Sequence, residues 1–365
     1  MRQLYVSSHS RIGYVSLFPE VAERYKHLIV LNGLSCIKAS ETLKEYAQEL
    51  VDSGQEIDLF YSPSHYNYLE GFAIRDKKVI VASSHLLENV TPKYPHLEVQ
   101  FIHFSRANKK QEEIIYRHQV QQLLLERNYQ TKQAYEQFSK AKTFHEKKEK
   151  IYLSAMDFNK ADQVAEDLKK KLFKNPKKRK RVNVTEKFFF GAATPKGAVN
   201  FIDELTKGMQ RRIIIKGRSG SGKSTLMNKI AKKARELGMN VSYFYCAFDP
   251  TSVDMIIIHE IKTAIIDGIA PHVIEPNRTG DEVVDMFELC MDPIVEKARK
   301  FEINDCENNY SLLMKQGTKH LQKAHESQLV IDEYLNLSID EEKFSQMERE
   351  ARRKIFELLS YTDKK

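Results

Sequence analysis

Residues 211–238 read RRIIIKGRSGSGKSTLMNKIAKKARELG, in which an apolar run, a glycine-rich loop and an amphipathic segment follow one another directly. The β-branched residues Ile213, Ile214 and Ile215 favour a buried strand. After the loop, apolar residues are spaced for one face of a helix, and Gly238 is suited to the left-handed conformation that ends many helices. The stretch therefore predicts a strand, a loop and a helix in succession.

The loop between strand and helix matches the pattern GxxxxGK[ST] in full. Its glycines let backbone amides turn toward an anion without interference from Cβ atoms, and the following helix adds the positive end of its dipole. Lys223 is placed to reach the β- and γ-phosphates of a nucleotide, and the Ser224 hydroxyl to coordinate Mg²⁺. Phosphate contacts are expected along the whole loop, from Gly217, Arg218, Ser219, Gly220, Ser221, Gly222, Lys223, Ser224 and Thr225.

Residues 27–54, HLIVLNGLSCIKASETLKEYAQELVDSG, have the same layout of apolar run, loop, amphipathic segment and closing glycine. Superposing Gly33 on Gly217 fixes an offset of 184 residues, and the two halves then align without a gap from the first residues to about Pro92 on Pro276. Of the 92 aligned pairs 14 are identical, and apolar character is matched in both strands and both helices. The sequence therefore predicts a duplicated P-loop domain.

The two copies differ in the loop itself. Gly222 and Lys223 are replaced by Lys38 and Ala39, although Ser40 keeps the hydroxyl of Ser224. Without the lysine, the N-terminal loop lacks the charge that clamps phosphates, and a side chain at position 38 obstructs the close backbone approach that glycine permits. We therefore expect one nucleotide site, in the C-terminal half.

Two acidic residues follow predicted strands of the C-terminal half. Asp267 ends an apolar run before a glycine, as in a Walker B strand, whose carboxylate holds Mg²⁺ through water. Asp249 lies at the strand edge where α/β proteins bind ligands, and it is a candidate to orient an attacking water. Asp-Gly and Asp-Pro pairs are also common in turns. At the same positions the N-terminal half has Ser83 and His65, so its losses are correlated.

The composition is that of a globular protein, with 41% hydrophobic and 30% charged residues in a chain of 365. The first residues lack the apolar run of a secretion signal, and no run is long enough to span a membrane. Four scattered cysteines predict reduced thiols, so we expect a cytoplasmic protein without membrane contact. The predicted division is 1–181, a degenerate P-loop domain with a helical arm, and 182–365, a P-loop NTPase domain with a helical arm.

Two charged helical segments and a basic linker are candidates for binding partners. Residues 111–172 and 293–359 have helical periodicity with long charged faces, which predicts arms packed on or projecting from the α/β cores. Residues 169–181, KKKLFKNPKKRKR, hold nine basic residues and no acid, in a chain of net charge +8. This run suits contact with nucleic acid or another polyanion, and equally a solvated connection between domains. The arms could bind a protein partner.

The P-loop and its flanks resemble an uncharacterised family of bacterial tandem P-loop ATPases. The flanks are FFFGAATPKGAVNFIDELTKG before the loop and FDPTSVDMIIIHEIKTAIIDGIAPHVIEP after it, and the resemblance covers most of the chain. It implies two tandem P-loop NTPase-like α/β domains, each a parallel sheet flanked by helices, with helical additions. The positions that it carries over are Gly217, Gly222, Lys223, Ser224, Thr225, Asp249, Asp267, Gly268 and His272.

Together these observations predict Mg²⁺-dependent binding and hydrolysis of a nucleoside triphosphate, with ATP the expected nucleotide, in the C-terminal half. Lys223 and the loop amides would hold phosphates, Ser224 and Asp267 the metal, and Asp249 the attacking water. The alternatives are a kinase of a small molecule or nucleoside, with Arg278 as a phosphate contact, and a nucleotide-gated binding module. An ABC ATPase is disfavoured because no LSGGQ-like segment occurs.

Overall fold

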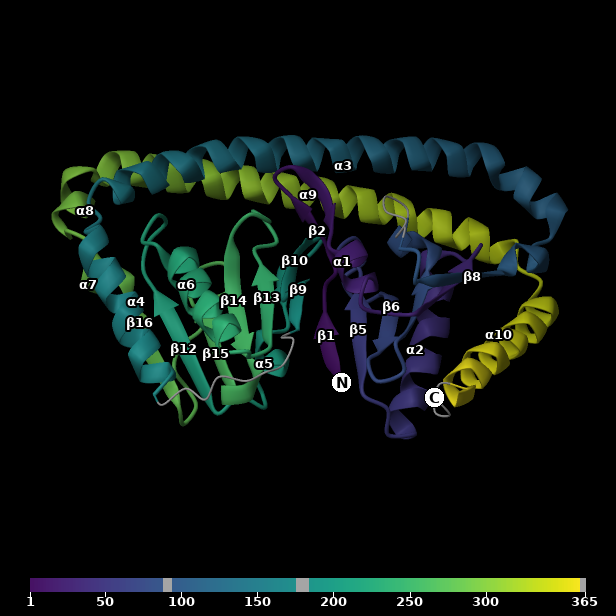
Figure 1. Ribbon diagram of the computed structural model, residues 1–365. Coiled ribbons are helices and arrows are strands. Elements are labelled where there is room, and N and C mark those ends of the chain that lie inside the picture. The colour runs from purple at the N-terminus through teal and green to yellow at the C-terminus, as the bar shows by residue number, and fades with distance from the viewer. Residues whose placement is uncertain (88–93, 175–183, 362–365) are drawn as a thin grey trace.

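Two six-stranded sheets lie side by side beneath a pair of long helices in the computed structural model, which describes residues 1–87, 94–174 and 184–361 (Figure 1). The N-terminal sheet has the order β1 (Arg2–Leu4), β5 (Ile57–Tyr61), β6 (Leu69–Ile74), β7 (Val79–Ser83), β4 (His27–Asn32) and β8 (Glu98–His103). The C-terminal sheet has the order β9 (Thr185–Phe189), β13 (Val241–Tyr245), β14 (Val253–Ile258), β15 (Thr263–Asp267), β12 (Arg211–Lys216) and β16 (Asp281–Asp285). The duplication predicted from sequence is therefore present as two α/β sheets of one topology.

The sequence predicts parallel sheets, and most strands of both sheets are indeed parallel. One strand in each sheet is antiparallel, so both sheets are mixed. β6 and β14 each run antiparallel to both neighbours, whereas the other pairings within the two sheets are parallel. The reason is the short connection from β13 to β14, because a parallel neighbour needs a crossover of a dozen residues or more. β14 therefore begins at the edge where β13 and β15 end.

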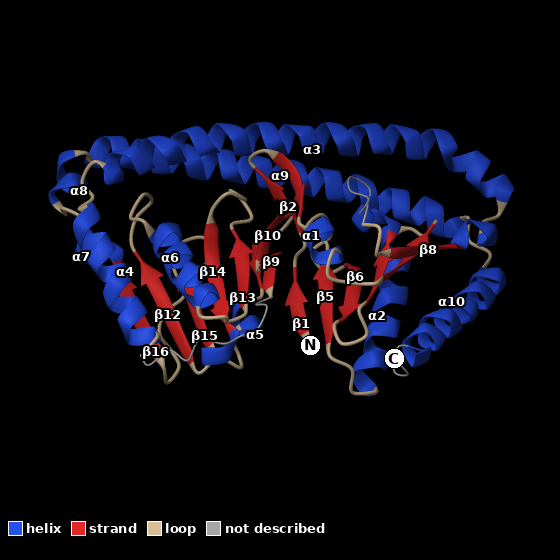
Figure 2. Ribbon diagram, in the orientation of Figure 1, coloured by secondary structure: helices blue, strands red, loops and turns tan. Residues whose placement is uncertain are grey.

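The predicted helices after the two loops are present as α2 (Cys36–Asp52) and α6 (Lys223–Glu236), and Figure 2 distinguishes the helices from the strands by colour. Two hairpins precede the loops, β2 (Ser7–Ser10) with β3 (Gly13–Ser16), and β10 (Gly191–Thr194) with β11 (Gly197–Asn200). The shorter elements are α1 (Phe18–Ala22), η1 (Ser84–Leu87), η2 (Phe104–Ala107), α5 (Ile202–Leu205), η3 (His259–Ile261), α7 (Met286–Cys290) and α8 (Ile294–Ala298).

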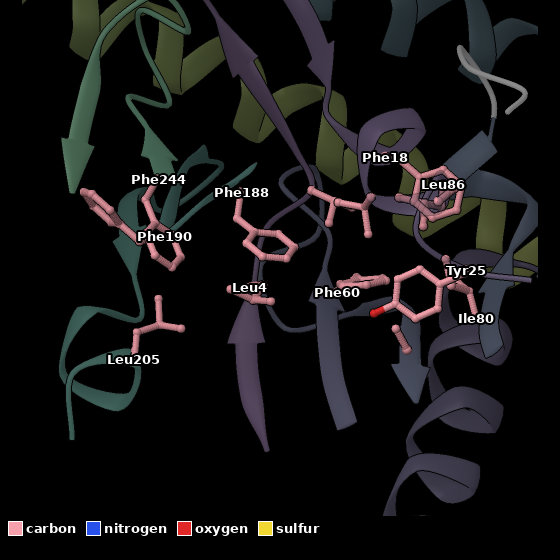
Figure 3. Close-up of a cluster of buried hydrophobic side chains, with 14 of the residues drawn as sticks. Leu4, Phe18, Tyr25, Phe60, Ile80, Leu86, Phe188, Phe190, Leu205 and Phe244 are labelled. Carbon is pink, nitrogen blue, oxygen red and sulfur yellow. The ribbon is translucent and has the colours of Figure 1, made fainter. Parts of the chain in front are cut away.

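One hydrophobic core is shared by the two halves. Phe18 and Phe60 of the N-terminal half belong to the same buried cluster as Phe188 and Phe244 of the C-terminal half (Figure 3). Burial of large aromatic side chains is strongly favourable, so this cluster holds the two sheets together. The two halves therefore form one folded body rather than two separate domains joined by a linker.

Equivalent residues of the repeat meet each other at the centre of the molecule. Tyr5 and Phe189, which are 184 positions apart, exchange two backbone hydrogen bonds of 3.1 and 2.9 Å. Arg2 and Glu186, also 184 apart, form an ion pair at 2.9 Å. Burial alone would raise the pKa of Glu186, but Arg2 and Arg24 outweigh it and hold that pKa well below its ordinary value. The halves are therefore related by an approximate two-fold axis between β1 and β9.

The helical arms are exchanged between the halves. α3 (Lys110–Leu153) leaves the N-terminal sheet and crosses to the C-terminal one, while α9 (Lys300–Leu337) runs antiparallel beside it (Figure 1). At about 1.5 Å per residue, α3 is long enough to pass over both sheets. α4 (Phe158–Leu172) then packs Ala165 and Leu168 into the C-terminal core, and α10 (Glu341–Tyr361) packs Ile355 into the N-terminal core. Each core is thus completed by the arm of the other half.

The basic linker begins inside a helix. Lys169 and Lys171 belong to α4 and form ion pairs with Glu166 at 2.7 Å and with Glu282 at 2.5 Å. The remaining cluster at 175–181, and the predicted domain boundary after residue 181, lie outside the described residues. None of the helices in the described ranges is long and apolar enough to cross a membrane.

Candidate functional site

The loop from 217 to 224, here called the P-loop, has the backbone that its glycines predict. Gly217 has φ +141°, and a Cβ atom there would lie 2.6 Å from Ser221 Oγ. Gly222 has φ +78° in the left-handed region, immediately before α6 begins at Lys223. Side chains at either position would be strained, so glycine is required for this tight turn into the helix. The first amides of α6, which lack partners within the helix, therefore follow this turn directly.

Lys223 and Ser221 give the P-loop its polar interior. Lys223 is only 8% exposed, and its Nζ donates to the Arg218 carbonyl oxygen at 2.9 Å and lies 3.7 Å from Asp267 Oδ2. Ser221 Oγ is fully buried and has no hydrogen-bond partner among the described residues. An unsatisfied buried hydroxyl is costly, so its presence inside a phosphate-binding turn fits a ligand that supplies oxygen acceptors.

The Ser224 hydroxyl makes a hydrogen bond that has an equivalent in the N-terminal half. Ser224 Oγ accepts a hydrogen bond from the Val253 amide at 3.0 Å, and Ser40 Oγ accepts the equivalent bond from the Leu69 amide at 2.9 Å. Because the N-terminal loop lacks the phosphate-clamping lysine, this bond serves to join the helix to its neighbouring strand. The hydroxyl of Ser224 still faces the P-loop cavity and retains an oxygen lone pair for a metal ion.

A cavity of about 530 Å³ opens beside the P-loop and is here called the P-loop cavity. Its walls come from both halves of the chain. Residues 219–226, the loop after β13 and the end of β15 form the floor, and α3 and α9 form the roof. The polar side chains lining it include Lys142, His145, Glu149, Ser224, Asp249, Asp254, Asp267, His272 and Tyr310.

Asp267 and Asp249 occupy different surroundings in this cavity. Asp267 ends β15 directly beside Ile215 of β12, so the strand pairing holds it next to the P-loop. Burial raises the pKa of Asp267, and Lys223 only partly offsets this. Asp249 instead accepts from Lys142 Nζ at 2.8 Å and from Thr251 Oγ1 at 2.7 Å. Although burial opposes ionisation, these bonds hold the pKa of Asp249 well below its ordinary value.

A further carboxylate, Asp254, lines the cavity and was missed by the sequence analysis. It is the second residue of β14, and it reaches the site because this antiparallel strand begins at the edge where its neighbours end. Burial, reinforced by the charge of Asp267, raises the pKa of Asp254 to about 7. The signal that could have found it is the repeat, since position 70 at the offset of 184 is Glu.

Other expected residues lie at the margin of the site or away from it. The Arg218 side chain pairs with Glu296 at 2.6 Å, so only its backbone contributes to the loop interior. His272 lines the cavity, and burial lowers its pKa to about 4. Arg278, proposed as a phosphate contact of a kinase, donates instead to Asp203 at 2.6 Å and is not among the residues that line the cavity. Arg278 therefore lies away from the cavity in this structure, where its guanidinium binds α5.

The N-terminal loop, residues 33–40, is closed by an acid from the opposite arm. α2 begins at Cys36, three positions before the equivalent of Lys223, which is Ala39. The fully buried carboxylate of Asp332 on α9 accepts the Cys36 amide at 3.0 Å, and burial raises its pKa. Lys38 turns away, its Nζ 4.5 Å from the centre of the Phe344 ring. An internal carboxylate thus sits where the positive end of the helix dipole would attract an anion.

A second cavity, of about 590 Å³, lies over the N-terminal loop. It is lined by four histidines, His9, His65, His85 and His325. His65 Nδ1 and His325 Nδ1 are 2.7 Å apart, and burial lowers the pKa of both. Within the described ranges no three His, Cys, Asp or Glu side chains are arranged to hold a metal ion. The two halves therefore keep cavities at equivalent places with different linings.

Comparison with known proteins gives one local similarity. Residues 199–266, which are 68 of the 365, match the family model for the N-terminal region of nephrocystin 3. The match runs from β11 through the P-loop and α6 to β15 and ends one residue before Asp267. Neither the curated proteins nor the solved structures include one that matches this chain. The similarity is thus confined to the segment that builds the P-loop.

Proposed function

We propose that this protein binds a nucleoside triphosphate, with ATP the expected nucleotide, and hydrolyses it in the P-loop cavity. The single observation that carries the proposal is the P-loop itself, with left-handed Gly222 before α6, buried Lys223 directed into the turn and an unsatisfied Ser221 hydroxyl inside it. The similarity of residues 199–266 to the nephrocystin 3 N-terminal region supports the proposal, since it spans this loop. The proposed function also agrees with the resemblance of the sequence to tandem P-loop ATPases.

The oxygen donors present fit Mg²⁺. Ser224, Asp254 and Asp267 all line the cavity, and Mg²⁺ in nucleotide sites is usually held by one or two carboxylates together with water and phosphate oxygens. When bound, the ion neutralises charge on the phosphates. Ser224 and Asp267 would hold it, and the high pKa of Asp254 leaves that residue able to give up or accept a proton near neutral pH.

The chain's own residues supply placement and charge. Lys223 and the loop amides bind the β- and γ-phosphate oxygens, and Asp249, which lines the same cavity, orients the attacking water. The oxygen of that water forms a bond to the γ-phosphorus while the bond from that phosphorus to the bridging oxygen breaks, and its electron pair leaves with the nucleoside diphosphate. One proton of the water passes to a carboxylate of the cavity.

Phosphate release is the decisive measurement. The purified protein is incubated with Mg²⁺ and ATP, GTP, CTP or UTP, and free phosphate is followed with and without a panel of nucleosides. Release in water alone supports hydrolysis, whereas loss of ATP without free phosphate, and with a phosphorylated nucleoside, would establish the kinase alternative. Binding without consumption of any nucleotide would favour the nucleotide-gated module.

Partners and location remain proposals. The basic run at 169–181 is proposed to contact nucleic acid or another polyanion, and the test is the salt dependence of binding to single- and double-stranded DNA and RNA. The exposed faces of the long helices are the proposed site for a protein partner. A cytoplasmic location is the expectation from the sequence.

A further inference from the structure

The exchanged arm brings the N-terminal half into the P-loop cavity. α3 lies so close to the P-loop that a Cβ atom at Gly220 would be 2.9 Å from the Glu149 carbonyl oxygen. Lys142 lies seven residues, or about two turns, before Glu149 and therefore on the same face of α3. Both residues line the P-loop cavity. A cationic side chain from the other half is thus held over the loop.

Lys142 is positioned by an acid of the site. Its Nζ lies 2.8 Å from Asp249 Oδ2, and its side chain is only 12% exposed. Asp249 is also 3.3 Å from Arg11 Nη2 in the turn between β2 and β3, so two cations of the N-terminal half share this carboxylate. Arg11 can keep Asp249 ionised if Lys142 moves, because an opposite charge nearby favours the charged form.

The pairing of Lys142 with Asp249 occurs in only one half of the repeat. α3 ends at Leu153 and α9 at Leu337, so the offset of 184 holds for the arms as well. At this offset Lys142 corresponds to Glu326 and Asp249 to His65. Lys142 lines the cavity over the complete P-loop, whereas Glu326 is exposed and is not among the residues that line the cavity over the N-terminal loop. At this position of the arms, a charged side chain therefore reaches a cavity only in the half that has the complete P-loop.

We propose that Lys142 is a catalytic residue of the hydrolysis proposed above, supplied to the site by the arm of the opposite half. Its flexible four-carbon stem lets the ammonium exchange the Asp249 carboxylate for an oxygen of the γ-phosphate as negative charge develops there. The exchange frees one Asp249 oxygen to accept a hydrogen bond from the attacking water. This inference rests on the proposed function, since it requires turnover at the P-loop.

The test compares two lysines of the same helix. Lys142→Met keeps the length of the side chain and removes its charge, and Lys140→Met is the control because Lys140 is exposed and is not among the residues lining the cavity. We expect Lys142→Met to lower kcat by about 100-fold, as loss of one charge-stabilising donor does in other enzymes. The Kd for ADP should change by less than about threefold, and the control should match the wild type. Lys142→Arg should retain more turnover than Lys142→Met.

Binding of ADP with aluminium fluoride separates catalysis from structure. This complex imitates the transferring phosphoryl group, so Lys142→Met should weaken its binding far more than that of ADP alone. Equal loss of affinity for both, or full turnover by a folded Lys142→Met protein, would overturn the assignment of Lys142 while leaving the proposed hydrolysis intact. If Lys142→Met does not fold, Lys142→Arg with wild-type turnover supports the assignment, and Lys142→Arg without turnover overturns it. Absence of turnover by the wild type would overturn the proposed function and this inference together.

Discussion

The N-terminal loop and the P-loop begin with equivalent glycines, Gly33 and Gly217, and differ in the residues after them. In the P-loop a buried lysine is directed into an open cavity. In the N-terminal loop the helix starts three residues earlier and its first amide is bound by Asp332 from the opposite arm. The N-terminal loop therefore differs from the P-loop in two ways at once, because it lacks the cation and its helix terminus is neutralised by an internal acid.

The largest expected effect on turnover is that of replacing Lys223, the lysine of the P-loop. Lys223→Ala should lower nucleotide turnover by about 1,000-fold or more without unfolding the protein, because it removes the charge that is proposed to contact the phosphates. In this background Ala39→Lys should restore nothing, since Asp332 still occupies the N-terminus of α2. Phosphate release and equilibrium binding of a fluorescent ATP analogue measure both. Binding regained by the double variant would show that the N-terminal loop is not closed.

Asp267→Asn should have the next largest effect. Turnover with Mg²⁺ should fall by about 100-fold, while nucleotide binding measured in EDTA should change much less, because the carboxylate is proposed to act through the metal. Titrating Mg²⁺ at fixed nucleotide concentration gives the comparison. If binding in EDTA falls as far as turnover, Asp267 serves the turn before Gly268 rather than a metal ion.

The closure of the N-terminal loop can be tested by stability. Asp332→Ala should destabilise the protein by about 1–3 kcal/mol, because it leaves the buried Cys36 amide without its acceptor. The matched control is Lys148→Ala, the equivalent position on α3, which pairs with the half-exposed Glu307 and should cost under about 0.5 kcal/mol. Urea unfolding followed by circular dichroism measures both. Equal costs would contradict a special role for Asp332.

The smallest effect concerns Asp254, whose position is acidic in both halves. Its pKa is raised from 3.8 to about 7, so the stability gained from its protonated form is complete below about pH 3.8 and is lost as the pH rises through about 7. The asparagine side chain of the Asp254→Asn variant cannot ionise. The melting temperature of this variant relative to the wild type should therefore rise by a few degrees between pH 5 and pH 8, as measured by thermal scans without nucleotide. A difference that is constant over this range would contradict the raised pKa.

Local features of the C-terminal half were predictable from the sequence. Ile213, Ile214 and Ile215 lie in β12, α6 begins at Lys223 as the loop spacing predicts, and the offset of 184 correctly indicates two copies of one fold. These predictions succeed because strand periodicity, glycine spacing and repeats act over short distances in the sequence. The place of Asp254 in the cavity was not predicted, because it is a single acid in a strand whose antiparallel direction was not anticipated.

The exchange of arms could not be predicted in the same way. The apolar faces of α4 and α10 have helical spacing that suits either core, so the pattern does not say which sheet they cover. Asp332 is likewise one acid among many charges on α9, and only the three-dimensional path of that helix brings it to α2. Contacts between distant parts of the chain are set by packing, which no local pattern encodes.

The exchange also determines when the protein can finish folding as it is synthesised. All strands of the N-terminal sheet precede residue 104, yet one face of that sheet is covered by Phe344 and Ile355, which the ribosome adds more than 200 residues later. Contacts of such long sequence separation form slowly, and the apolar face they cover is open to other molecules in the meantime. A nascent chain halted after the first half therefore carries a complete sheet with an unfinished core.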